Sequence, residues 1–396
     1  MRVAFTLIGG KNWTGGYNYL LNLIRSLHKY SENDIQPVLF VGEDTDPHDI
    51  EPFQKYLFRP AVKTRLFNQS QKTKQLVLTI VRGRNILVEA LFKDYHIDVV
   101  FEAATFYGFH FNIPVVAWVP DFQHRHMSNM FSFFSYWKRE IGIHAQIISK
   151  RIIMLSSEDS KKDCERFYQS SVGNTYVVPF AVEMNGKHPK QSLSLGELRE
   201  KYDIPADFYY LPNQFWKHKN HQVVIDGLKK LIDRGYNYVV VSSGQPLDPR
   251  HPMLYRYLRE RVKKLSLENN FIFLGMIPYN DLVGLMLAAK AVINPSLFEG
   301  WSTTVEECKT LGVPLLLSDI PVHREQAEKT ALFFDPISPE NFADILIHFS
   351  TVSDSIHKSR IYCDSIPERM DIFCRRFQEA VFMAIKKKHQ NSLLYP

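Results

Sequence analysis

Short hydrophobic runs alternate with amphipathic stretches along almost the whole chain. The runs are rich in Val, Ile and Leu and are too short for helices, so each one predicts a buried strand. In the stretches between them the apolar residues recur at helical spacing. We predict strands at residues 2–8, 37–41, 98–101, 114–119, 152–155, 175–178, 208–211, 238–241, 271–274, 291–293 and 314–317, and helices at residues 17–28, 221–234, 251–265, 279–289 and 304–311.

A polar stretch at residues 179–195, which contains Gly and Pro, separates two such series of elements. Strands that alternate with helices form parallel sheets with helices on both faces, the doubly wound plan. A chain of 396 residues has room for two such sheets at ~150 residues per domain. We therefore predict an α/β fold in which two doubly wound, Rossmann-like domains, residues 1–185 and 190–368, face a central cleft. Open parallel sheets bind ligands at the carboxyl ends of their strands, so the candidate site residues are sought there.

The composition narrows the class of protein and its compartment. Lys and Arg number 48 against 42 Asp and Glu, and the net charge of +6 suits an anionic ligand or membrane surface without being a nucleic-acid signature. The four cysteines are scattered with no CxxC pair, so we expect free thiols in a reducing compartment. The apolar N-terminal run is too short for a signal peptide, and no run reaches the ~18 residues of a transmembrane helix. We expect a cytoplasmic protein.

A strand, a loop and a helix follow one another in residues 291–312. We expect the helix to begin at Ser302 or Thr303, with Thr303 and Glu306 as a capping box and Gly312 as its C-terminal stop. The unpaired N–H groups and the dipole at the start of this helix favour a phosphate group.

Two carboxylates flank this helix start. Glu299 lies in the loop and Glu307 lies in the first turn of the helix, so both can border one anionic ligand and bind sugar or ribose hydroxyls. The alternative is that Glu307 only complements the helix dipole and that Glu299 is solvated. Local chemistry leaves both interpretations open.

Glu299 and Glu307 also stand at the spacing of the E-x7-E motif of family 4 glycosyltransferases. The match with that family continues through residues 311–314 and 318–325. The chain therefore resembles these retaining enzymes, which have the GT-B fold. The resemblance implies that a last helix, residues 369–396, packs back on the first domain.

The resemblance also implies roles for this segment. Glu299 contacts the donor sugar, Glu307 binds the ribose hydroxyls of the nucleotide, and the backbone after the glycine receives the diphosphate. Family members usually have Gly-Phe-Gly-Leu-Pro at this place. In this chain the hydroxyl groups of Ser302, Thr303 and Thr304 are expected to add hydrogen-bond donors to the phosphates. The segment that receives the diphosphate consists of Gly300, Trp301, Ser302, Thr303 and Thr304.

The loop after the strand at residues 208–211 opens a helix and carries several cations. Lys219 matches the family lysine that holds the leaving diphosphate, where a fixed ammonium stabilises developing negative charge. Gln214 stands where the family arginine is expected, and Asn213 precedes it in the predicted donor site. Lys217 is our candidate for the missing charge; the alternative is that it is a solvated turn residue.

Three other loops contribute to the predicted donor site. Gly15 and Gly16 match a family glycine pair between the first strand and the first helix, where the backbone approaches the donor phosphates closely. Gly244 follows a strand of the second half and is expected to line the nucleotide pocket. Met276 and Ile277 follow the next strand and are expected to contact the base.

The strand at residues 114–119 leads to further candidate catalytic residues. Many family members have a His-Asp pair at the end of this strand, where the histidine reaches the donor sugar. Here Pro120 takes the histidine position and Asp121 is kept. His124 and His126 are the candidates for the lost imidazole, and the alternative is that they are polar loop residues bonded locally.

No metal or other cofactor is expected, since the co-substrate is the nucleotide-diphosphate sugar itself. Asp44 and Asp46 form a D-x-D pattern, but they lie in a polar turn and the GT-B interpretation needs no such metal. His124 and His126 lack an evident third ligand in the local sequence.

Basic residues cluster in residues 59–93 and are mixed with aliphatic residues. Such a segment can rest on anionic lipid at the inner face of the membrane while a lipid-linked acceptor is presented. The alternative is a solvated helical face.

We therefore expect a retaining glycosyltransferase that moves a hexose-like sugar from a nucleotide-diphosphate donor to a hydroxyl acceptor. The expected acceptor is a growing surface polysaccharide, a lipopolysaccharide or a lipid-linked glycan, and no nucleic-acid partner is expected. Two alternatives stay open. One is another GT-B enzyme, either a nucleotide-sugar epimerase or a base-modifying glucosyltransferase, and the other is a non-catalytic GT-B subunit.

Overall fold

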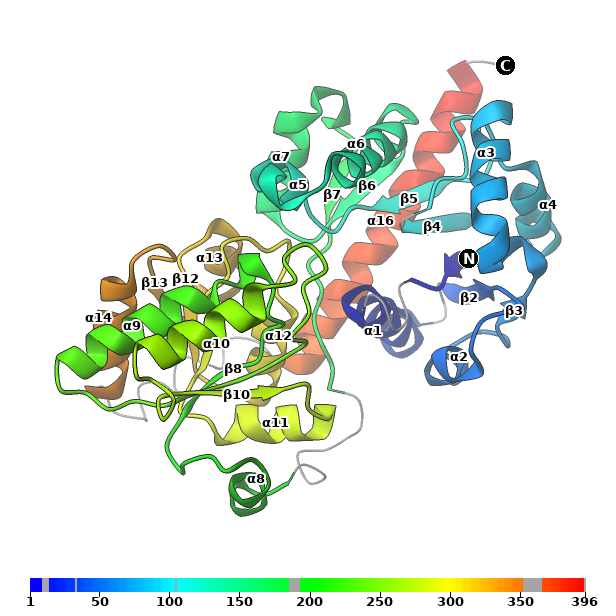
Figure 1. Cartoon of the computed structure of the whole chain (residues 1–396). Helices are drawn as coiled ribbons and strands as arrows, with labels where there is room; N and C mark the ends of the chain where they lie inside the picture. Colours follow the sequence, from blue (N-terminus) through cyan, green and yellow to red (C-terminus); the bar gives the residue numbers. More distant parts are fainter. Residues whose placement is uncertain (9–13, 33, 104, 185–192, 352–364, 395–396) are drawn as a thin grey trace. The chain divides into compact units, whose positions relative to one another are not determined.

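The computed structural model describes residues 1–8, 14–32, 34–103, 105–184, 193–351 and 365–394. The chain divides into two compact units, which we call unit 1 (Met1–Ala181 with Pro367–Pro396) and unit 2 (Val182–Ile366). Each unit is built on its own parallel sheet, and each is described by itself below (Figure 1).

Unit 1 contains a seven-stranded parallel sheet in the order β3-β2-β1-β4-β5-β6-β7. Its central strands are buried on both faces because helices cover both, which explains why they are continuous apolar runs. The strands are β1 (Arg2–Thr6), β2 (Gln36–Val41), β3 (Val62–Lys63), β4 (Val99–Ala103), β5 (Val115–Trp118), β6 (Ile152–Leu155) and β7 (Thr175–Val177), and the helices are α1 (Thr14–Tyr30), α2 (Pro47–Gln54), α3 (Lys72–Arg82), α4 (Ile86–Asp94), α5 (Gln123–His126), α6 (Phe133–Ile148) and α7 (Glu158–Phe167).

The last helix, α16 (Ile366–Leu394), completes the core of unit 1 although it follows unit 2 in the chain. The ring of Phe377 lies 6.0 Å from that of Phe5 and 5.7 Å from that of Phe101, both on strands of the sheet. The hydroxyl of Ser26 in α1 donates to the carbonyl of Met370 over 3.1 Å. The helix therefore packs on the sheet face that α1 also covers.

Unit 2 contains a six-stranded parallel sheet in the order β10-β9-β8-β11-β12-β13. One face is covered by α9, α10 and α14, and the other by α8, α11 and α12. The strands are β8 (Tyr209–Leu211), β9 (Val240–Ser243), β10 (Phe271–Gly275), β11 (Val292–Asn294), β12 (Leu315–Ser318) and β13 (Ala331–Phe334), and the helices are α8 (Leu195–Tyr202), α9 (His221–Asp233), α10 (Leu254–Lys264), α11 (Tyr279–Ala288), α12 (Thr303–Leu311), α13 (Pro321–Ala327) and α14 (Pro339–Thr351).

The topological switch point of unit 2 lies between β8 and β11, which are neighbours in the middle of the sheet. The helix that follows β8 is α9, and the helix that follows β11 is α12, and these two pack on opposite faces. The two loops therefore diverge beyond the carboxyl ends of the strands, and this is where doubly wound sheets bind their ligands.

The predicted α/β class and the doubly wound arrangement of the sheets are confirmed. The sequence pattern did not predict strands β3 and β13 or helices α2 to α8, α13 and α14. The first helix begins at Thr14 rather than at residue 17, so Gly15 and Gly16 lie inside its first turn.

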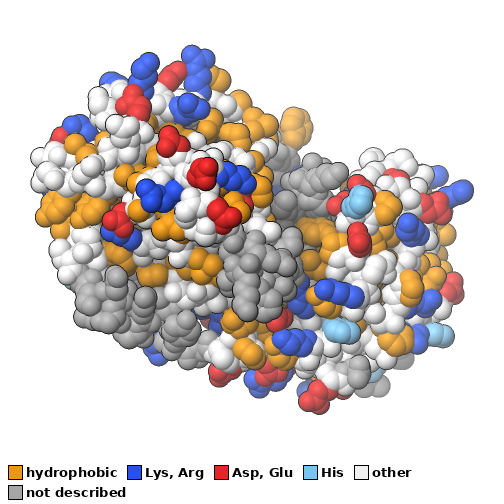
Figure 2. All heavy atoms as spheres, turned by 90° about the horizontal axis from the view of Figure 1, so that it is seen from below, with side chains coloured by type: hydrophobic (Ala, Val, Ile, Leu, Met, Phe, Trp, Pro, Cys, Tyr) orange, Lys and Arg blue, Asp and Glu red, His pale blue; other side chains and the backbone are white. Residues whose placement is uncertain are grey.

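The described helices include none that is long and apolar enough to cross a membrane. On the face of the molecule seen in Figure 2, Lys and Arg side chains are interspersed with Asp and Glu side chains. The excess of positive charge is therefore not concentrated on that face.

Candidate active site

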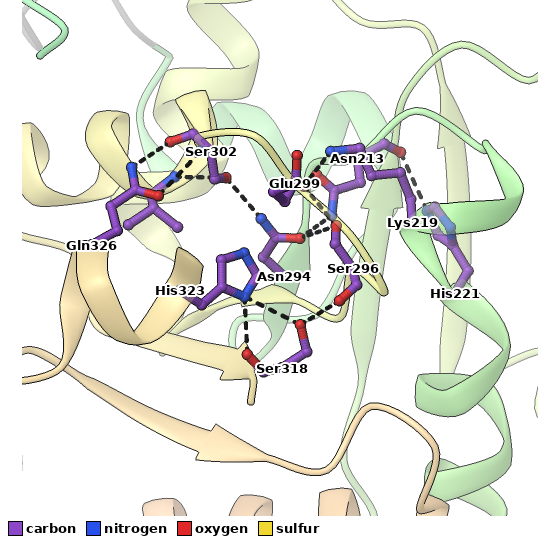
Figure 3. Close-up of polar contacts among 11 residues, drawn as sticks. Asn213, Lys219, His221, Asn294, Ser296, Glu299, Ser302, Ser318, His323 and Gln326 are labelled. Atoms are coloured by element: carbon purple, nitrogen blue, oxygen red, sulfur yellow. Dashed lines mark hydrogen bonds and ion pairs between the residues drawn. The ribbon is translucent and has the colours of Figure 1, made fainter. Parts of the chain in front are cut away.

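Asn294, at the end of β11, connects the two loops of the switch point (Figure 3). Its side chain is fully buried, and its Oδ1 accepts a hydrogen bond from Asn213 Nδ2 over 3.0 Å. Its Nδ2 donates to Ser302 Oγ over 2.9 Å. The loop after β8, the loop after β11 and the start of α12 are thereby held together by one amide group.

Lys219 and Glu299 form an ion pair at this place, with Lys219 Nζ 2.5 Å from Glu299 Oε1. The same carboxylate oxygen accepts a hydrogen bond from Ser296 Oγ over 2.7 Å. The two charged side chains are only 16% and 11% exposed. Lys219 and Glu299, the first glutamate of the E-x7-E pattern, are therefore in direct contact.

Burial alone would raise the pKa of Glu299, but the Lys219 ammonium and the His218 and His323 imidazoles more than offset it and hold the pKa below its usual value. His323 is itself buried, and burial lowers its pKa. Its Nδ1 donates to the carbonyl of Ser318 over 3.0 Å, which fixes the orientation of the ring. Glu299 is thus an anion near neutral pH, in a setting where positive charge is already placed.

The start of α12 differs in detail from the sequence expectation. Ser302 is the N-cap, and its Oγ accepts from the N–H of Val305, so the predicted capping box of Thr303 and Glu306 does not form. Glu306 instead accepts a hydrogen bond from Gln326 Nε2 over 2.9 Å. The reason is that the helix is capped one residue earlier than expected, so Val305 and not Glu306 takes the position that a capping box needs.

Gln326 fixes the backbone at the same helix start. Its Oε1 accepts from the N–H of Ser302 over 3.1 Å, and its Nε2 donates to the carbonyl of Ser302 over 2.8 Å. The amides of Thr303 and Thr304 have no helical carbonyl one turn earlier, as at any helix start. Such amides are the usual donors to a phosphate group.

Glu307 lies on α12 and accepts a hydrogen bond from the Tyr279 hydroxyl over 3.2 Å. Burial raises the pKa of Glu307 to about 7, an effect that the Tyr279 bond only partly offsets. The carboxyl group therefore titrates near neutral pH, unlike that of Glu299.

The turn that carries Lys219 has a fixed shape. Asn220 adopts a left-handed conformation, with φ +52°, and its side-chain amide donates to the carbonyls of Pro295 and Pro336. In this turn Lys219 points to Glu299, whereas Lys217 is exposed. The geometry favours the interpretation of Lys217 as a solvated turn residue over its predicted role in replacing the family arginine.

The loops after β9 and β10 adjoin this turn. Gly244 has φ +153°, and a Cβ atom there would lie 2.4 Å from the carbonyl oxygen of Asn213, so only glycine fits. Gln214 is half-buried beside it. Met276 is exposed at the end of β10 and Ile277 is half-buried. Gly244 thus lies against the backbone of Asn213 and Gln214. The structure gives no contact that tests the predicted roles of Gln214, Met276 and Ile277 in donor binding.

The predicted catalytic residues of unit 1 are placed as follows. Asp121 accepts from the N–H of Gln123 over 2.9 Å and forms an ion pair with Arg139, with Oδ1 2.7 Å from the guanidinium. His124 is fully buried, and its Nε2 lies 3.1 Å from Glu140 Oε2. Burial, with help from Arg139, lowers the pKa of His124.

These contacts argue against the predicted catalytic role of His124. A fully buried imidazole that is bonded to a carboxylate of its own unit stabilises the fold and does not reach a substrate. His126 is only partly exposed and pairs with Asp163. The structure therefore supports the alternative for both histidines, that they are polar residues bonded locally.

Other sequence candidates belong to unit 1. Gly15 and Gly16 are in the first turn of α1 in unit 1, and the loop residues 9–13 before them lie outside the described residues. Asp46 caps α2 by accepting from the N–H of His48, and Asp44 accepts from the N–H of Gln69. Within the described part of the chain, no group of three His, Cys, Asp or Glu side chains is placed to hold a metal ion.

Sequence reasoning missed several residues that hold the site. Asn294, Ser296 and Gln326 are buried polar side chains, and their partners are Asn213, Ser302 and the charged pair. Asn294 and Ser296 follow a buried strand directly, and that position is the signal that identifies them. Gln326 offers no such signal because it lies inside a short helix.

Residues 197–360, most of unit 2, match the family model described as "Glycosyl transferases group 1". Among curated proteins the chain is similar to the "O-antigen chain mannosyltransferase RfbU" of Salmonella typhimurium, with 26% identity over 37% of this chain and 39% of that protein. It is also similar to the "UDP-Gal:alpha-D-GlcNAc-diphosphoundecaprenol alpha-1,3-galactosyltransferase" of Escherichia coli, with 23% identity over 46% of this chain and 45% of that protein. The chain thus spans less than half the length of these relatives.

Solved structures match over both units. A glycosyltransferase from Rickettsia africae matches with a TM-score of 0.68 and 14% identity, over 97% of this chain and 98% of that chain. Anabaena HepE in complex with UDP and glucose matches with a TM-score of 0.64 and 16% identity, over 99% of both chains. The protein therefore has the GT-B fold, and the part that matches the glycosyltransferase group 1 model lies in its second unit.

Proposed function

We propose that the protein is a family 4 glycosyltransferase that retains the anomeric configuration. It transfers a hexose-like sugar from a nucleotide-diphosphate donor to a hydroxyl group of a surface polysaccharide, lipopolysaccharide or lipid-linked glycan. The observation that carries the proposal is the largely buried Lys219–Glu299 pair at the switch point of unit 2, next to the start of α12. A cation and free backbone amides suit the diphosphate of a sugar donor, and a carboxylate suits the sugar hydroxyls because it accepts their hydrogen bonds.

The donor lies along the loops of unit 2 in this proposal. Lys219 and the amides of Thr303 and Thr304 bind the diphosphate, Glu299 accepts from hydroxyls of the sugar, and Glu307 accepts from the ribose. Among the matched proteins, one solved structure contains UDP and glucose, and one relative is named for the transfer of galactose from UDP-Gal. These names support a nucleotide-sugar donor without fixing which one this chain uses.

The proposed reaction proceeds by attack from the front face. The bond between the sugar C1 and the diphosphate oxygen breaks, and the acceptor oxygen bonds to C1 on the same face. The acceptor proton passes to the departing phosphate oxygen, while Lys219 and the helix start stabilise the negative charge that develops there. No metal ion is required for this charge balance, and none is assigned.

The acceptor class is proposed from the names of relatives. Two of them are an O-antigen chain mannosyltransferase and an enzyme whose acceptor is a sugar linked to diphosphoundecaprenol. The second name refers to a sugar linked to a lipid diphosphate. We therefore infer an acceptor at the membrane surface, with the protein in the cytoplasm and in peripheral contact with the inner face of the membrane.

Two successive measurements test donor binding and the stereochemistry of transfer. Thermal shift with UDP, GDP and their sugars identifies the nucleotide, and NMR of the product formed from the stabilising donor gives the anomeric configuration. The expected result is one preferred nucleotide and a product with the configuration of the donor. A product of inverted configuration, or an epimerised donor formed without any acceptor, would refute the proposal.

A further inference from the structure

Helix α3 in unit 1 has its apolar side turned outward. Thr79 is its only buried residue, although the helix contains several aliphatic side chains. Ile80 is 58% exposed and Val81 is 77% exposed. The exposed aliphatic residues continue into the first turn of α4, and we call this set the aliphatic surface: Leu76, Val77, Ile80, Val81, Ile86 and Leu87.

The aliphatic surface has a defined structure, because hydrogen bonds connect α3 and α4. Asn85 caps α4 by accepting from the N–H of Val88 over 3.1 Å, and its Nδ2 donates to Gln75 Oε1 of α3 over 3.1 Å. Gly83 ends α3 with φ +69°. The two helices are thus connected by a defined corner, and the apolar residues on both sides of it face away from the core.

The charged residues of the segment that carries the aliphatic surface are all basic, and one of them, Arg65, is paired with Glu43 from outside the segment. Residues 52–88 contain no Asp or Glu. Among the described residues no ion pair involves Lys72, Lys74 or Arg82, which stand at the two ends of α3. The basic residues of residues 52–88 are Lys55, Arg59, Lys63, Arg65, Lys72, Lys74, Arg82 and Arg84.

We propose that the aliphatic surface and its flanking cations bind an anionic lipid bilayer, with α3 lying in the interface. Exposed aliphatic side chains enter the boundary between headgroups and acyl chains, and long basic side chains reach outward to anionic headgroups. Binding of this kind increases with the apolar area and with the number of Lys and Arg residues near the surface.

A second copy of the chain is a poorer occupant. A symmetric dimer places the same patch of both subunits face to face. The cations of α3 would then oppose their own copies with no carboxylate in residues 52–88 to compensate them. A nucleic acid would use the cations but would leave the aliphatic side chains exposed to water.

The proposal that the aliphatic surface binds lipid rests on the proposed function only for its purpose, which is to bring the enzyme to a lipid-linked acceptor. Binding to lipid needs no donor and no turnover. A vesicle experiment therefore tests the surface alone, and a failure of the proposed glycosyl transfer would leave its result unchanged.

The test is co-sedimentation of the full chain with vesicles of phosphatidylcholine, with and without phosphatidylglycerol. The variant Ile80→Asp/Val81→Asp changes two exposed positions. We expect binding to the anionic vesicles only, weakening as salt is added, and a loss of about tenfold or more in the variant. Ile337→Asp is the matched control, since Ile337 is exposed at 79% in unit 2 and its replacement is expected to leave binding unchanged.

A second measurement does not depend on a destabilising substitution. A polarity-sensitive fluorophore on Val81→Cys, in a Cys363→Ser background, reports whether this position enters lipid. The three other cysteines are buried and so are protected from labelling. A blue shift with anionic vesicles supports the proposal.

Three results would overturn it. One is equal binding of the Ile80→Asp/Val81→Asp variant and the parent. Another is a lipid-free dimer of the parent that this variant abolishes. The third is loss of binding in Phe133→Ser/Phe134→Ser, on the exposed start of α6, while the α3 variant still binds, because that would move the contact to another helix of unit 1.

Discussion

Lys219 Nζ lies 2.5 Å from Glu299 Oε1, although 80 residues separate the two in the chain. The turn after β8 supplies the lysine and the loop after β11 supplies the glutamate. Because these strands are neighbours in the sheet, the pair forms at the switch point without any long side-chain reach. The Lys219 ammonium also helps to hold the pKa of the Glu299 carboxyl below its usual value, against the effect of burial.

Replacement of Lys219 by Met tests the contribution of this pair to catalysis and to stability. We expect kcat to fall by about 100-fold, because a fixed positive charge is lost where the leaving group becomes negative. The free energy of unfolding should fall by about 3 kcal/mol, because Glu299 is left as a buried charge without its partner. Steady-state kinetics and urea denaturation measure the two effects.

The double variant Lys219→Met/Glu299→Gln separates stability from catalysis. Removal of both charges should restore much of the lost stability and none of the lost activity. Equal activity in Lys219→Met and the parent would contradict the proposed role of the lysine, whatever the stability of either protein.

Glu307 should make nucleotide binding depend on pH. Its pKa is raised to about 7, so the carboxyl group is largely protonated below that pH and ionised above it. The carboxylate is the better acceptor for ribose hydroxyls, so affinity should rise as pH increases through 7. In Glu307→Gln, affinity at pH 8 should be about tenfold weaker and this pH dependence should disappear, as measured by calorimetry.

The same shift predicts an effect on stability with a definite sign. The folded chain holds a proton on Glu307 up to about pH 7, whereas the unfolded chain releases it near pH 4.5. The contribution of Glu307 to stability is therefore present at low pH and is lost as pH rises through about 7. Glu307→Gln should raise Tm at pH 8 and change it little at pH 4. An identical Tm difference at both pH values would rule out the burial effect.

Asn294 should be essential for the shape of the site. In Asn294→Ala the side chains of Asn213 and Ser302 lose their partner, and both are buried. We expect a loss of about 3 kcal/mol in the free energy of unfolding and a matching loss of donor affinity. Gln222→Ala is the control because Gln222 is exposed on α9, and it should cost less than about 0.5 kcal/mol. A stable Asn294→Ala protein with normal donor affinity would show that the two loops hold their shape without this amide.

Glycosyl transfer should be independent of divalent metal ions. Lys219 and the start of α12 supply the positive potential that a bound cation gives in other sites. Activity should persist in excess chelator and should not increase with added manganese. Loss of turnover in chelator and its return with manganese would contradict the proposal and would direct attention to Asp44 and Asp46.

Local patterns in the sequence were sufficient for the fold class and for the two loops of the switch point. Both loops follow continuous apolar runs, and the position of a residue directly after such a run is a local property. Glu299 and Lys219 lie in these two loops and were singled out by their match to the family motif, and the structure brings them together. Gly312 was also predicted correctly as the end of α12, where it has φ +68°.

Nonlocal packing explains what the sequence did not reveal. Gln326 reaches back 24 residues to fix Ser302, and no spacing rule connects those two positions. His124 was expected at the site because it follows a strand, but Glu140 on α6 binds its imidazole in the interior of unit 1. The segment of α3 was named in the sequence as a candidate lipid contact, but amphipathic spacing does not reveal which side of a helix packs, so its outward aliphatic side is known only from the structure.

Lys217→Ala should be nearly silent, with kcat and KM within about twofold of the parent. Lys217 is exposed, and its backbone N–H, which any residue provides, is what donates to the buried Asp248 carboxylate over 3.3 Å. Gln214→Arg should instead raise kcat by several-fold, because it restores a charge that acts most strongly as the sugar–phosphate bond breaks. Lys290→Ala, an exposed lysine after α11, is the matched control for loss of surface charge. If Lys217→Ala lowers kcat by tenfold while KM is unchanged and Gln214→Arg has no effect, then Lys217 does supply the charge of the missing arginine, and the turn must rearrange to bring it to the diphosphate.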